Sequence, residues 1–568
     1  MLFPSVRRKG IFFSERTFTM EKWVVSAKRA DFQAIAEKFG IDQVTARLIR
    51  NRDIVGEPEI RKYLYGTKED FYDPHLLKDA DKLVEILMSK IKEQKKIRII
   101  GDYDIDGVNA SYILLRGLRR CHANADVEIP DRMKDGYGIN EHLIRYAYEE
   151  GVDTILTCDN GIAAVEQTKL AKSLGMTILI TDHHEVQEEV PPADAVVNPR
   201  QADCPYPFKH LCGAAVAYKV ICCLYEAYGI PKEETEEFLE FAGFATVGDV
   251  MDLIGENRIL VKEGLKRLNH TQNVGMASLI RACGLEEKEI KSYHIGFVLG
   301  PCINAGGRLD TAKRSLNLLL QKDRAKADVM AAELKTLNDE RKDMTQTGAE
   351  EAIEWIEKEG RSQDKVLVVY LPDCHESLAG IIAGRIRERY NKPVFVLTDS
   401  IDGVKGSGRS IEAYSMFEEM SKCKELYTKY GGHPMAAGLS LPKENVEKFR
   451  TFLNEHTTLT EEDFIPKITI DVPMPIGYVT EHLIEELSVL EPFGKGNTKP
   501  VFAARDVTLL GARILGKNRN VLKLQVQDVN GCRIEAMLFH HADDFLGKLE
   551  EQYGKTEVEA LLKGRGRQ

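Results

Sequence analysis

Residues 97–107 read IRIIGDYDIDG, a short apolar run that ends in three carboxylates. The run is typical of a buried strand. Two further apolar runs also end in polar clusters, since residues 154–161 read TILTCDNG and residues 176–185 read MTILITDHHE. In an open α/β sheet, ligands bind where parallel strands end. The pattern therefore predicts an α/β fold with a metal-centred active site at the strand ends.

The segment around these clusters alternates strands with helices. Helices are expected over residues 109–120 and 163–174, and a further short strand over residues 195–197. This rhythm predicts βαβ units and a mostly parallel sheet. Residues 213–290 read as mainly helical and contain Asp249, another carboxylate after an apolar stretch.

The rest of the chain predicts a second domain and a β-rich module. Residues 324–360 form one charged helical pattern that would connect domains as a semi-rigid spacer. Strand rhythm restarts at residues 366–370, and β-like runs begin at Ile468. We expect an N-terminal extension (1–19), a helical lead-in (20–90), the parallel-sheet catalytic domain (91–323), the connecting helix (324–360), a smaller α/β domain (361–460) and a β-module (461–568).

Bulk properties exclude some classes of protein. No apolar stretch reaches the roughly 20 residues of a membrane helix, and residues 1–19 lack the apolar core of a signal peptide. Eleven scattered cysteines indicate a reduced, cytoplasmic protein with buried or incidental thiols. The net charge of −11 argues against a globally basic nucleic-acid coat, but it permits a local basic channel.

The polar clusters fit hard divalent cations. Carboxylate oxygens with imidazole nitrogens suit Mg²⁺ or Mn²⁺. If the strand stays extended, alternation puts Asp102, Asp104 and Asp106 on one side of its end. Two ions about 3.5–4 Å apart can activate water and stabilise the leaving oxygen of a phosphodiester. In the pair His183-His184, one ring can bind metal and the other can donate a proton or contact phosphate.

Each cluster also has a structural interpretation. A DxDxDG pattern occurs in calcium loops and helix caps, and a DHH pattern occurs in surface turns. The three clusters and Asp249, taken together, favour a metal centre. Three glycine motifs are further candidates, namely GSGRS at residues 406–410 as a phosphate cradle, GGHPMAAG at residues 431–438 as a close backbone approach, and GPCINAGGR at residues 300–308. Their structural alternatives are a plain loop and a tight helix–strand corner.

In order, DYDIDG, CDNG, TDHH and GDVMDL resemble the four motifs of the DHH phosphoesterase superfamily, and GGHPMAAG resembles its companion DHHA1 domain. Finer matches, among them ENRILVKEGL, HESLAGIIAGRI and EPFGKGN, narrow the resemblance to the bacterial RecJ family, from about Trp23 to about Phe539. The resemblance implies a C-terminal OB-like module. It also implies 5′→3′ hydrolysis of single-stranded DNA to 5′-mononucleotides in DNA repair and recombination, with two Mn²⁺ or Mg²⁺ ions.

The resemblance also implies site residues and partners. It implies metal ligands at Asp102, Asp104, Asp106, Asp159, His183 and Asp249, with Asp159 bridging the metals and Asp102 in support. Catalytic or supporting roles fall to His184, Asp182 and Asp159. Contacts to the 5′ phosphate and DNA fall to Arg132, Arg308, Ser407, Arg409, His433 and Gly432. Single-stranded DNA is the expected substrate, single-strand-binding protein and a RecQ-type helicase are the expected partners, and a monomer without membrane association is the expected state.

The chain departs from the family pattern in three places. HESLAGIIA replaces the usual start of one helix, which weakens the assignment of His375 as a site residue. Cys302 stands where arginine is common. After Phe539 the last strands of the OB module are missing, and the chain ends in a polar segment over residues 563–568. We therefore expect an incomplete barrel with an open edge, from a truncated or frameshifted gene or from a module that closes differently.

Two other functions stay open. One is a DHH phosphoesterase that acts on short RNA or on nucleotide second messengers, although such proteins are usually smaller. The other is an inactive scaffold like the relatives in eukaryotic replicative helicases. Such scaffolds have typically lost metal carboxylates, and all of them are present here.

Overall fold

The computed structural model of the chain describes residues 21–132, 135–136, 138–400, 403–516, 519–539 and 542–563. It divides into two compact units. One unit comprises Tyr65–Thr457 with Pro492–Thr498, and the other combines the chain up to Leu64, Thr458–Glu491 and the chain from Lys499. The expected extension at residues 1–19 and the last five residues lie outside the described residues. The expected lead-in has residues in both units, and the domain boundaries expected from the sequence stay predictions.

The larger unit begins with a five-stranded parallel sheet in the order β3-β2-β4-β5-β6. Its strands are β2 (Lys96–Ile100), β3 (Asn124–Glu128), β4 (Thr154–Cys158), β5 (Thr177–Thr181) and β6 (Ala195–Val197). The predicted parallel sheet is confirmed. The sequence analysis missed β3 because this edge strand reads NADVE and lacks an apolar run.

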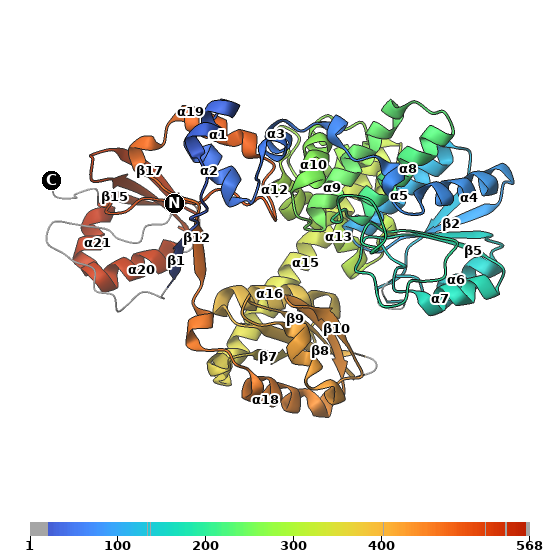
Figure 1. The fold of residues 1–568 in the computed structure, drawn as a ribbon. Coiled ribbons are helices and arrows are strands. Elements are labelled where there is room, and N and C mark those ends of the chain that lie inside the picture. Colours follow the sequence, from blue (N-terminus) through green and yellow to red (C-terminus); the bar gives the residue numbers. More distant parts are fainter. Residues whose placement is uncertain are drawn as a thin grey trace. The chain divides into compact units, whose positions relative to one another are not determined.

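Helices cover both faces of this sheet (Figure 1). One face packs against α4 (Ala80–Lys92), α5 (Ile105–Arg120) and α8 (Gly213–Ala227), and the other against α6 (Glu141–Glu149) and α7 (Val165–Ser173). Strand residues alternate between the two cores, since Ile99 faces the first and Ile100 the second. The helical region that follows contains α9 (Leu239–Gly248), α10 (Gly255–Leu268), α11 (Val274–Ala282), α12 (Ser292–His294), α13 (Gly300–Leu309) and α14 (Lys313–Leu320).

The long helix α15 (Arg324–Lys358) is confirmed, but it is more than a spacer. Ala331 and Leu334 near its start are buried in the first core, and Ala352 and Ile356 near its end are buried in a second core. Gly348 lies where a Cβ atom would come within 2.6 Å of the Ile382 side chain. The glycine therefore gives the Ile382 side chain room where α15 packs against α16 (Ala379–Tyr390).

The second core belongs to a five-stranded mixed sheet in the order β10-β11-β9-β8-β7. Strands β7 and β8 are parallel and the other pairs are antiparallel. The elements are β7 (Leu367–Tyr370), β8 (Val394–Ser400), β9 (Gly403–Arg409), α17 (Met416–Ser421), β10 (Lys429–His433), β11 (Ala436–Leu441) and α18 (Val446–His456).

In the smaller unit, β1 from the N-terminal part of the chain pairs in parallel with β12 from the C-terminal part. Its elements are β1 (Lys22–Val25), α1 (Phe32–Phe39), α2 (Gln43–Asn51), α3 (Glu57–Tyr65), β12 (Lys467–Ile470), β13 (Val472–Pro473), α19 (Glu481–Leu487), β14 (Phe502–Ala503), β15 (Thr508–Leu515), β16 (Val521–Gln527), β17 (Arg533–Leu538), α20 (Ala542–Tyr553) and α21 (Lys555–Leu562). Strands β15, β16 and β17 form an antiparallel sheet in that order, and the expected incomplete barrel stays a prediction.

The helices α20 and α21 follow this sheet, at the place where the last strands of an OB module were expected to be missing. Leu546 of α20 and Leu561 of α21 are buried with Leu524 of β16 in one core. The amphipathic helices thus cover an apolar surface that further strands would otherwise cover.

Candidate metal centre and phosphate pocket

Polar side chains gather at the carboxyl edge of the parallel sheet. Strands β2, β4 and β5 are neighbours, so the segments after them meet at one edge. Two ligands come from helix ends instead, because Asp106 lies in the first turn of α5 and Asp249 follows the last residue of α9. The structure thereby brings together the predicted metal ligands Asp102, Asp104, Asp106, Asp159, His183 and Asp249.

The DxDxDG motif does not stay extended, and the expectation that its three carboxylates share one side of a strand is wrong. Strand β2 ends at Ile100, and Asp104 caps α5 by accepting hydrogen bonds from the backbone of Asp106 (2.9 Å) and Gly107 (3.1 Å). An aspartate in this position satisfies amides at the helix start and favours a turn over further strand. The chain therefore bends between Asp104 and Asp106.

Asp106 is held by a different helix. Its carboxylate accepts hydrogen bonds from the backbone N–H groups of Gly213 (2.6 Å) and Ala214 (2.8 Å) at the start of α8. A helix N-terminus stabilises negative charge through its exposed N–H groups and its dipole. The first turn of α8 therefore fixes this ligand.

The carboxylates and imidazoles form three overlapping groups, of which Asp159, His183 and His184 are one, and the other two lie on either side of Asp159 and His183. Of these two, one contains Asp102, Asp104 and Asp159, and the other contains Asp106, His183 and Asp249, with ligand atoms in each group within 4.8 Å of one another. His183 Nε2 lies 3.0 Å from Asp159 Oδ1, 3.5 Å from Asp106 Oδ2 and 3.8 Å from Asp249 Oδ2. Asp159 is thus placed to contact ions in both groups.

The donor set fits two hard divalent cations. Oxygen donors predominate, and the single ring of His183 adds a nitrogen that Mn²⁺ accepts readily. Within the described residues, no hydrogen-bond partner reaches Oδ1 of Asp102 or either ring nitrogen of His183, and all three atoms are buried. Buried polar atoms without a hydrogen-bond partner are rare in proteins, and a bound ion is one explanation.

Burial and mutual repulsion disfavour the charged carboxylates. Burial and the neighbouring Asp104 raise the pKa of Asp102 well above its usual value, and burial and Asp106 raise the pKa of both Asp104 and Asp159. For Asp249, burial and Asp106 raise the pKa to about 8. Bound cations would relieve this repulsion by favouring the ionised forms.

Asp182 and His184 form a supporting pair. Asp182 accepts hydrogen bonds from the backbone of Ile162 (2.9 Å) and His183 (2.7 Å), and from Nδ1 of His184 (2.8 Å). Burial lowers the pKa of His184, but the bond to Asp182 outweighs burial and raises this pKa to about 9. Asp182 therefore positions the two histidines, and His184 holds a proton at neutral pH.

Unusual backbone angles occur at one predicted ligand and directly after another. Asp159 has a φ of 61°, a left-handed conformation that aspartate adopts more readily than most residues. Val250, directly after Asp249, has a φ of 57°, which is a strained value for a β-branched residue. Strain of this kind costs of order 1–3 kcal/mol and clusters at functional sites. The surrounding structure thus holds Asp159, and Val250 beside Asp249, against local backbone preference.

An arginine-lined region lies beside the metal motif. The guanidinium carbon of Arg132 lies 5.0 Å from the ring centroid of Tyr103, which is the residue between Asp102 and Asp104. Arg132 and Ser407 line a cavity of about 310 Å³ together with residues of β9, β10 and β11. The cavity is therefore shared by the parallel-sheet part and the mixed-sheet part of the larger unit.

Arg308 reaches the same region from α13. A Cβ atom at Gly307 would come within 2.2 Å of the Tyr103 carbonyl oxygen, so the glycine allows α13 to pack against the metal motif. The Arg308 Nη1 donates to the Ser377 carbonyl oxygen (2.9 Å). Burial, with repulsion from Arg132, lowers the pKa of Arg308 to about 10. Arginines brought together in this way would accept an anionic group.

The GSGRS motif forms a central strand and not a loop. Strand β9 pairs with β8 on one side and with β11 on the other, so its backbone amides take part in the sheet. The predicted backbone cradle is therefore wrong, and the motif can contribute only the side chains of Ser407 and Arg409. A Cβ atom at Gly380 would lie 2.9 Å from Arg409 Nη2, which explains the glycine on α16.

The remaining predicted residues lie farther from the cavity lining. Gly432 and His433 are at the end of β10, which forms a hairpin with β11 in place of the helix–strand corner considered above. His375 caps the short helix η6 (Glu376–Leu378) through its ring, and Cys302 is buried in α13. The roles of all predicted site residues stay predictions.

Sequence reasoning gave no role at the site to Lys495, although it belongs to the EPFGKGN motif. The Leu253 N–H donates to the Lys495 carbonyl oxygen (2.8 Å), and Lys495 Nζ lies 3.6 Å from Asp252 Oδ1. The charge of Lys495 opposes the rise in the pKa of Asp249. A motif that is distant along the chain thus lies against the fourth metal motif.

The fold and the site define a phosphoesterase of the DHH class. Three family models match in order, the DHH family N-terminal domain at residues 96–247, the DHHA1 domain at residues 363–458 and the RecJ OB domain at residues 470–558. The last match continues beyond Phe539, where the sequence analysis ended its resemblance.

Similar proteins narrow the assignment from the DHH class to one family within it. The single-stranded-DNA-specific exonuclease RecJ of Escherichia coli is 33% identical over 479 residues, which cover 80% of this chain and 82% of that protein. The chain belongs to the RecJ family. The Bacillus subtilis RecJ is 37% identical over 89% of this chain, and the chain spans 64% of that relative's length.

Solved structures agree with this assignment. RecJ of Thermus thermophilus in complex with Mn²⁺ matches with a TM-score of 0.76 and 27% identity, over 91% of this chain and 74% of that one. Its complex with Mg²⁺ matches with a TM-score of 0.72 and 26% identity, over 91% of this chain and 72% of that one. Within the described residues, no helix is long and apolar enough to cross a membrane.

Proposed function

We propose that this chain is a metal-dependent exonuclease that hydrolyses single-stranded DNA from the 5′ end to 5′-mononucleotides. One observation carries the proposal, which is that groups of metal ligands overlap at Asp159 and His183 beside a cavity lined by Arg132. The ligand groups account for phosphodiester hydrolysis. The arginines account for recognition of a terminal phosphate, and so for the end from which the strand is degraded.

The metal site would be held by Asp102, Asp104 and Asp159 on one side and by Asp106, His183 and Asp249 on the other. Two bound Mn²⁺ or Mg²⁺ ions would supply an activated water and charge neutralisation at the scissile phosphate. His184 is held through Nδ1 by Asp182, so its Nε2 would donate a proton to the leaving oxygen. Asp182 keeps that ring oriented, since it also accepts hydrogen bonds from the backbone of Ile162 and His183.

Arg132, Arg308 and Arg409 would bind the 5′ phosphate of the strand. Guanidinium groups bind phosphate through paired N–H donors. These arginines lie close enough for their charges to interact, since Arg132 and Arg409 both lower the pKa of Arg308. An anionic ligand removes that repulsion. Ser407 adds a hydroxyl donor on the same cavity wall.

The central test uses single strands labelled at the 5′ or the 3′ end, with Mn²⁺. We expect immediate release of the 5′ label as a mononucleotide, late release of the 3′ label, and little cleavage of blunt duplex. Release of the 3′ label first would contradict the proposed direction. Rapid cleavage of dinucleotides with inert long strands would favour the second-messenger phosphodiesterase.

A pair of variants on one strand tests the metal assignment. Asp159 follows β4, whereas Asp153 precedes the same strand at the other edge of the sheet and pairs with Lys90 (2.6 Å). Asp159→Ala should abolish activity at any Mn²⁺ concentration, and Asp153→Ala should retain it. Full activity in Asp159→Ala would remove the proposed metal centre.

A second pair tests the phosphate pocket. Arg308→Ala should raise KM for 5′-phosphorylated strands at least tenfold, with a smaller change for 5′-hydroxyl strands. Arg314, an arginine on the next helix that pairs with Asp310 and Glu333, provides the control. Equal effects on both substrates would show that Arg308 does not read the phosphate.

The family assignment also supports proposals about cellular context. We infer a cytoplasmic monomer that acts in repair and recombination alongside single-strand-binding protein and a RecQ-type helicase. Light scattering of the purified chain tests the oligomeric state. Stimulation of degradation by the helicase on a duplex with a 5′ overhang tests the functional partnership, and an unchanged rate would argue against it.

A further inference from the structure

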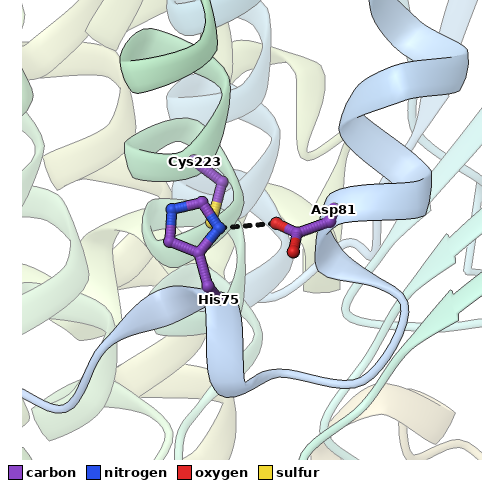
Figure 2. A group of neighbouring side chains, drawn as sticks. All are labelled: His75, Asp81 and Cys223. Atoms are coloured by element: carbon purple, nitrogen blue, oxygen red, sulfur yellow. Dashed lines mark hydrogen bonds and ion pairs between the residues drawn. The ribbon is translucent and has the colours of Figure 1, made fainter.

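A second group of side chains that could bind a metal lies in the larger unit. One of its members is on α8, the helix whose first turn holds Asp106. Figure 2 shows His75, Asp81 and Cys223 pointing toward one another from three segments. His75 belongs to the short helix η2 (Pro74–Leu76), Asp81 to the first turn of α4 and Cys223 to the last turns of α8. Their ligand atoms all lie within 4.8 Å of one another.

The ring of His75 is held in the orientation that metal-binding histidines use. Its Nδ1 lies 2.5 Å from Asp81 Oδ1, and its Nε2 lies 3.2 Å from Glu226 Oε2. In metal sites, a histidine commonly binds the ion through one nitrogen and donates its other N–H to a carboxylate, which fixes the ring. Nδ1 faces Asp81 (Figure 2), the sulfur of Cys223 lies within 4.8 Å of a ring nitrogen, and Glu226 occupies the supporting position.

A purely ionic explanation accounts for only part of this arrangement. A protonated His75 between Asp81 and Glu226 would form two surface ion pairs, which contribute little stability. Hydrogen bonding to Asp81 raises the pKa of His75 in agreement with that state. It leaves unexplained why the thiol of Cys223, which is 1% exposed, lies with its sulfur within 4.8 Å of a ring nitrogen of the same histidine. Thiol, imidazole and carboxylate together form a donor set for zinc.

We propose that His75 Nδ1, Asp81 Oδ1 and Cys223 Sγ bind a borderline divalent cation of the Zn²⁺ type, with water as the fourth ligand and Glu226 as the carboxylate that orients the histidine. Bond lengths of about 2.0–2.3 Å place tetrahedral donors roughly 3.3–3.8 Å apart. The donor atoms now lie within 4.8 Å of one another, so binding requires the side chains to adjust to that spacing. The sulfur distinguishes this site from the catalytic centre, whose donors are oxygen and nitrogen and which favours harder ions.

Binding releases protons in defined places. The thiol of Cys223 loses its proton to become the thiolate ligand, and a protonated His75 loses the proton on Nδ1 while Nε2 keeps its hydrogen bond to Glu226. Burial raises the pKa of Cys223, and the charge of Asp81 acts in the same direction, so the ion must displace a firmly held proton. Affinity should therefore rise with pH.

The site would act as a structural clamp. The ion would tie the segment from η2 to α4 onto the C-terminal part of α8. The first turn of the same helix donates two backbone hydrogen bonds to Asp106. Zn²⁺ should therefore raise the melting temperature of the full chain without being required for Mn²⁺-dependent hydrolysis.

Co²⁺ titration of the full chain tests the proposal, because a cobalt–thiolate bond gives a charge-transfer absorption in the near ultraviolet that oxygen and nitrogen ligands do not. We expect this band in the wild type and in Cys222→Ala, which removes the adjacent cysteine. The band should be lost in Cys223→Ala and in His75→Ala, a surface change that preserves the buried packing. Glu226→Gln should keep the band but weaken binding about 10- to 100-fold.

Two results would overturn the proposal. One is the absence of the thiolate band at saturating Co²⁺ in the wild type, and the other is a band that persists in His75→Ala. Exonuclease activity distinguishes this proposal from the proposed function, because Cys223→Ala should keep Mn²⁺-dependent degradation while losing stabilisation by Zn²⁺. In the wild type, an absent band with intact degradation would show that the zinc proposal fails, and a present band without degradation would show that the proposed function fails.

Discussion

Gly213 provides a test of how tightly the metal centre is packed, because it is not itself a ligand. A Cβ atom at Gly213 would lie 2.7 Å from Asp159 Cβ and 2.9 Å from Asp159 Oδ1. Favourable contacts between carbon atoms lie at about 3.5–4.0 Å. Gly213→Ala must therefore move Asp159 or the start of α8 by about 1 Å. The second movement would also lengthen the hydrogen bond from the Gly213 amide to Asp106 (2.6 Å).

The expected loss follows from that displacement. A misplacement of about 1 Å can lower a catalysed rate about 100-fold, which corresponds to about 2.7 kcal/mol of transition-state stabilisation. Overpacking should lower the free energy of unfolding by about 1–3 kcal/mol. The assay is the single-turnover rate on a 5′-labelled strand at saturating Mn²⁺, together with thermal unfolding.

Gly384 supplies the matched control. It lies inside α16, and a Cβ atom there would meet nothing within 4 Å. Gly384→Ala should keep the wild-type rate and should be neutral or stabilising by up to about 1 kcal/mol, because alanine favours helix more than glycine does. A wild-type rate in Gly213→Ala would refute the packing argument and, with it, the placement of Asp159 against α8.

Three further predictions concern stability, pH and metal binding. Lys219→Met should lower the free energy of unfolding in urea by about 3–5 kcal/mol, because it removes the Lys219 Nζ that lies 2.6 Å from Oε1 of the fully buried Glu256. A smaller loss in the double variant with Glu256→Gln would confirm this cause. Burial raises the pKa of Glu240 to about 7, above its unfolded value of 4.5, so its contribution to stability is greatest below pH 4.5 and falls as the pH rises through 7. Relative to Glu240→Gln, the wild type should lose about 3 kcal/mol over that window, and a pH-independent difference would show that Glu240 does not titrate there. Mn²⁺ binding at pH 7 should release protons, because the pKa of Asp249 is about 8 without metal. Calorimetry in buffers of different ionisation enthalpy should show this release, and identical heats in all buffers would contradict it.

The elements that sequence reasoning predicted well have strong local signals. The apolar runs of β2, β4 and β5 and the charged pattern of α15 are long enough to define their elements without tertiary context. The edge strand β3 was missed because partial exposure allows a polar sequence. The GSGRS motif was expected to cradle phosphate, with a plain loop as the structural alternative, whereas β9 places its glycines between two strands. A Cβ atom at Gly406 would lie 2.3 Å from the Leu397 side chain.

The sequence by itself determined which side chains form the candidate metal centre, because parallel strands bring their carboxyl ends to one edge and each motif directly follows a strand or helix. It could not determine how those ligands are distributed between the groups that would bind each metal ion. The bend at Asp104, the amides of α8 that hold Asp106 and the central position of Asp159 depend on segments far apart in the chain. The close packing of α13 at Gly307 against Tyr103, which brings Arg308 near the metal motif, depends on distant segments in the same way. The thiol of Cys223 gained a candidate role only when folding placed it beside His75, because its spacing along the chain carries no such signal.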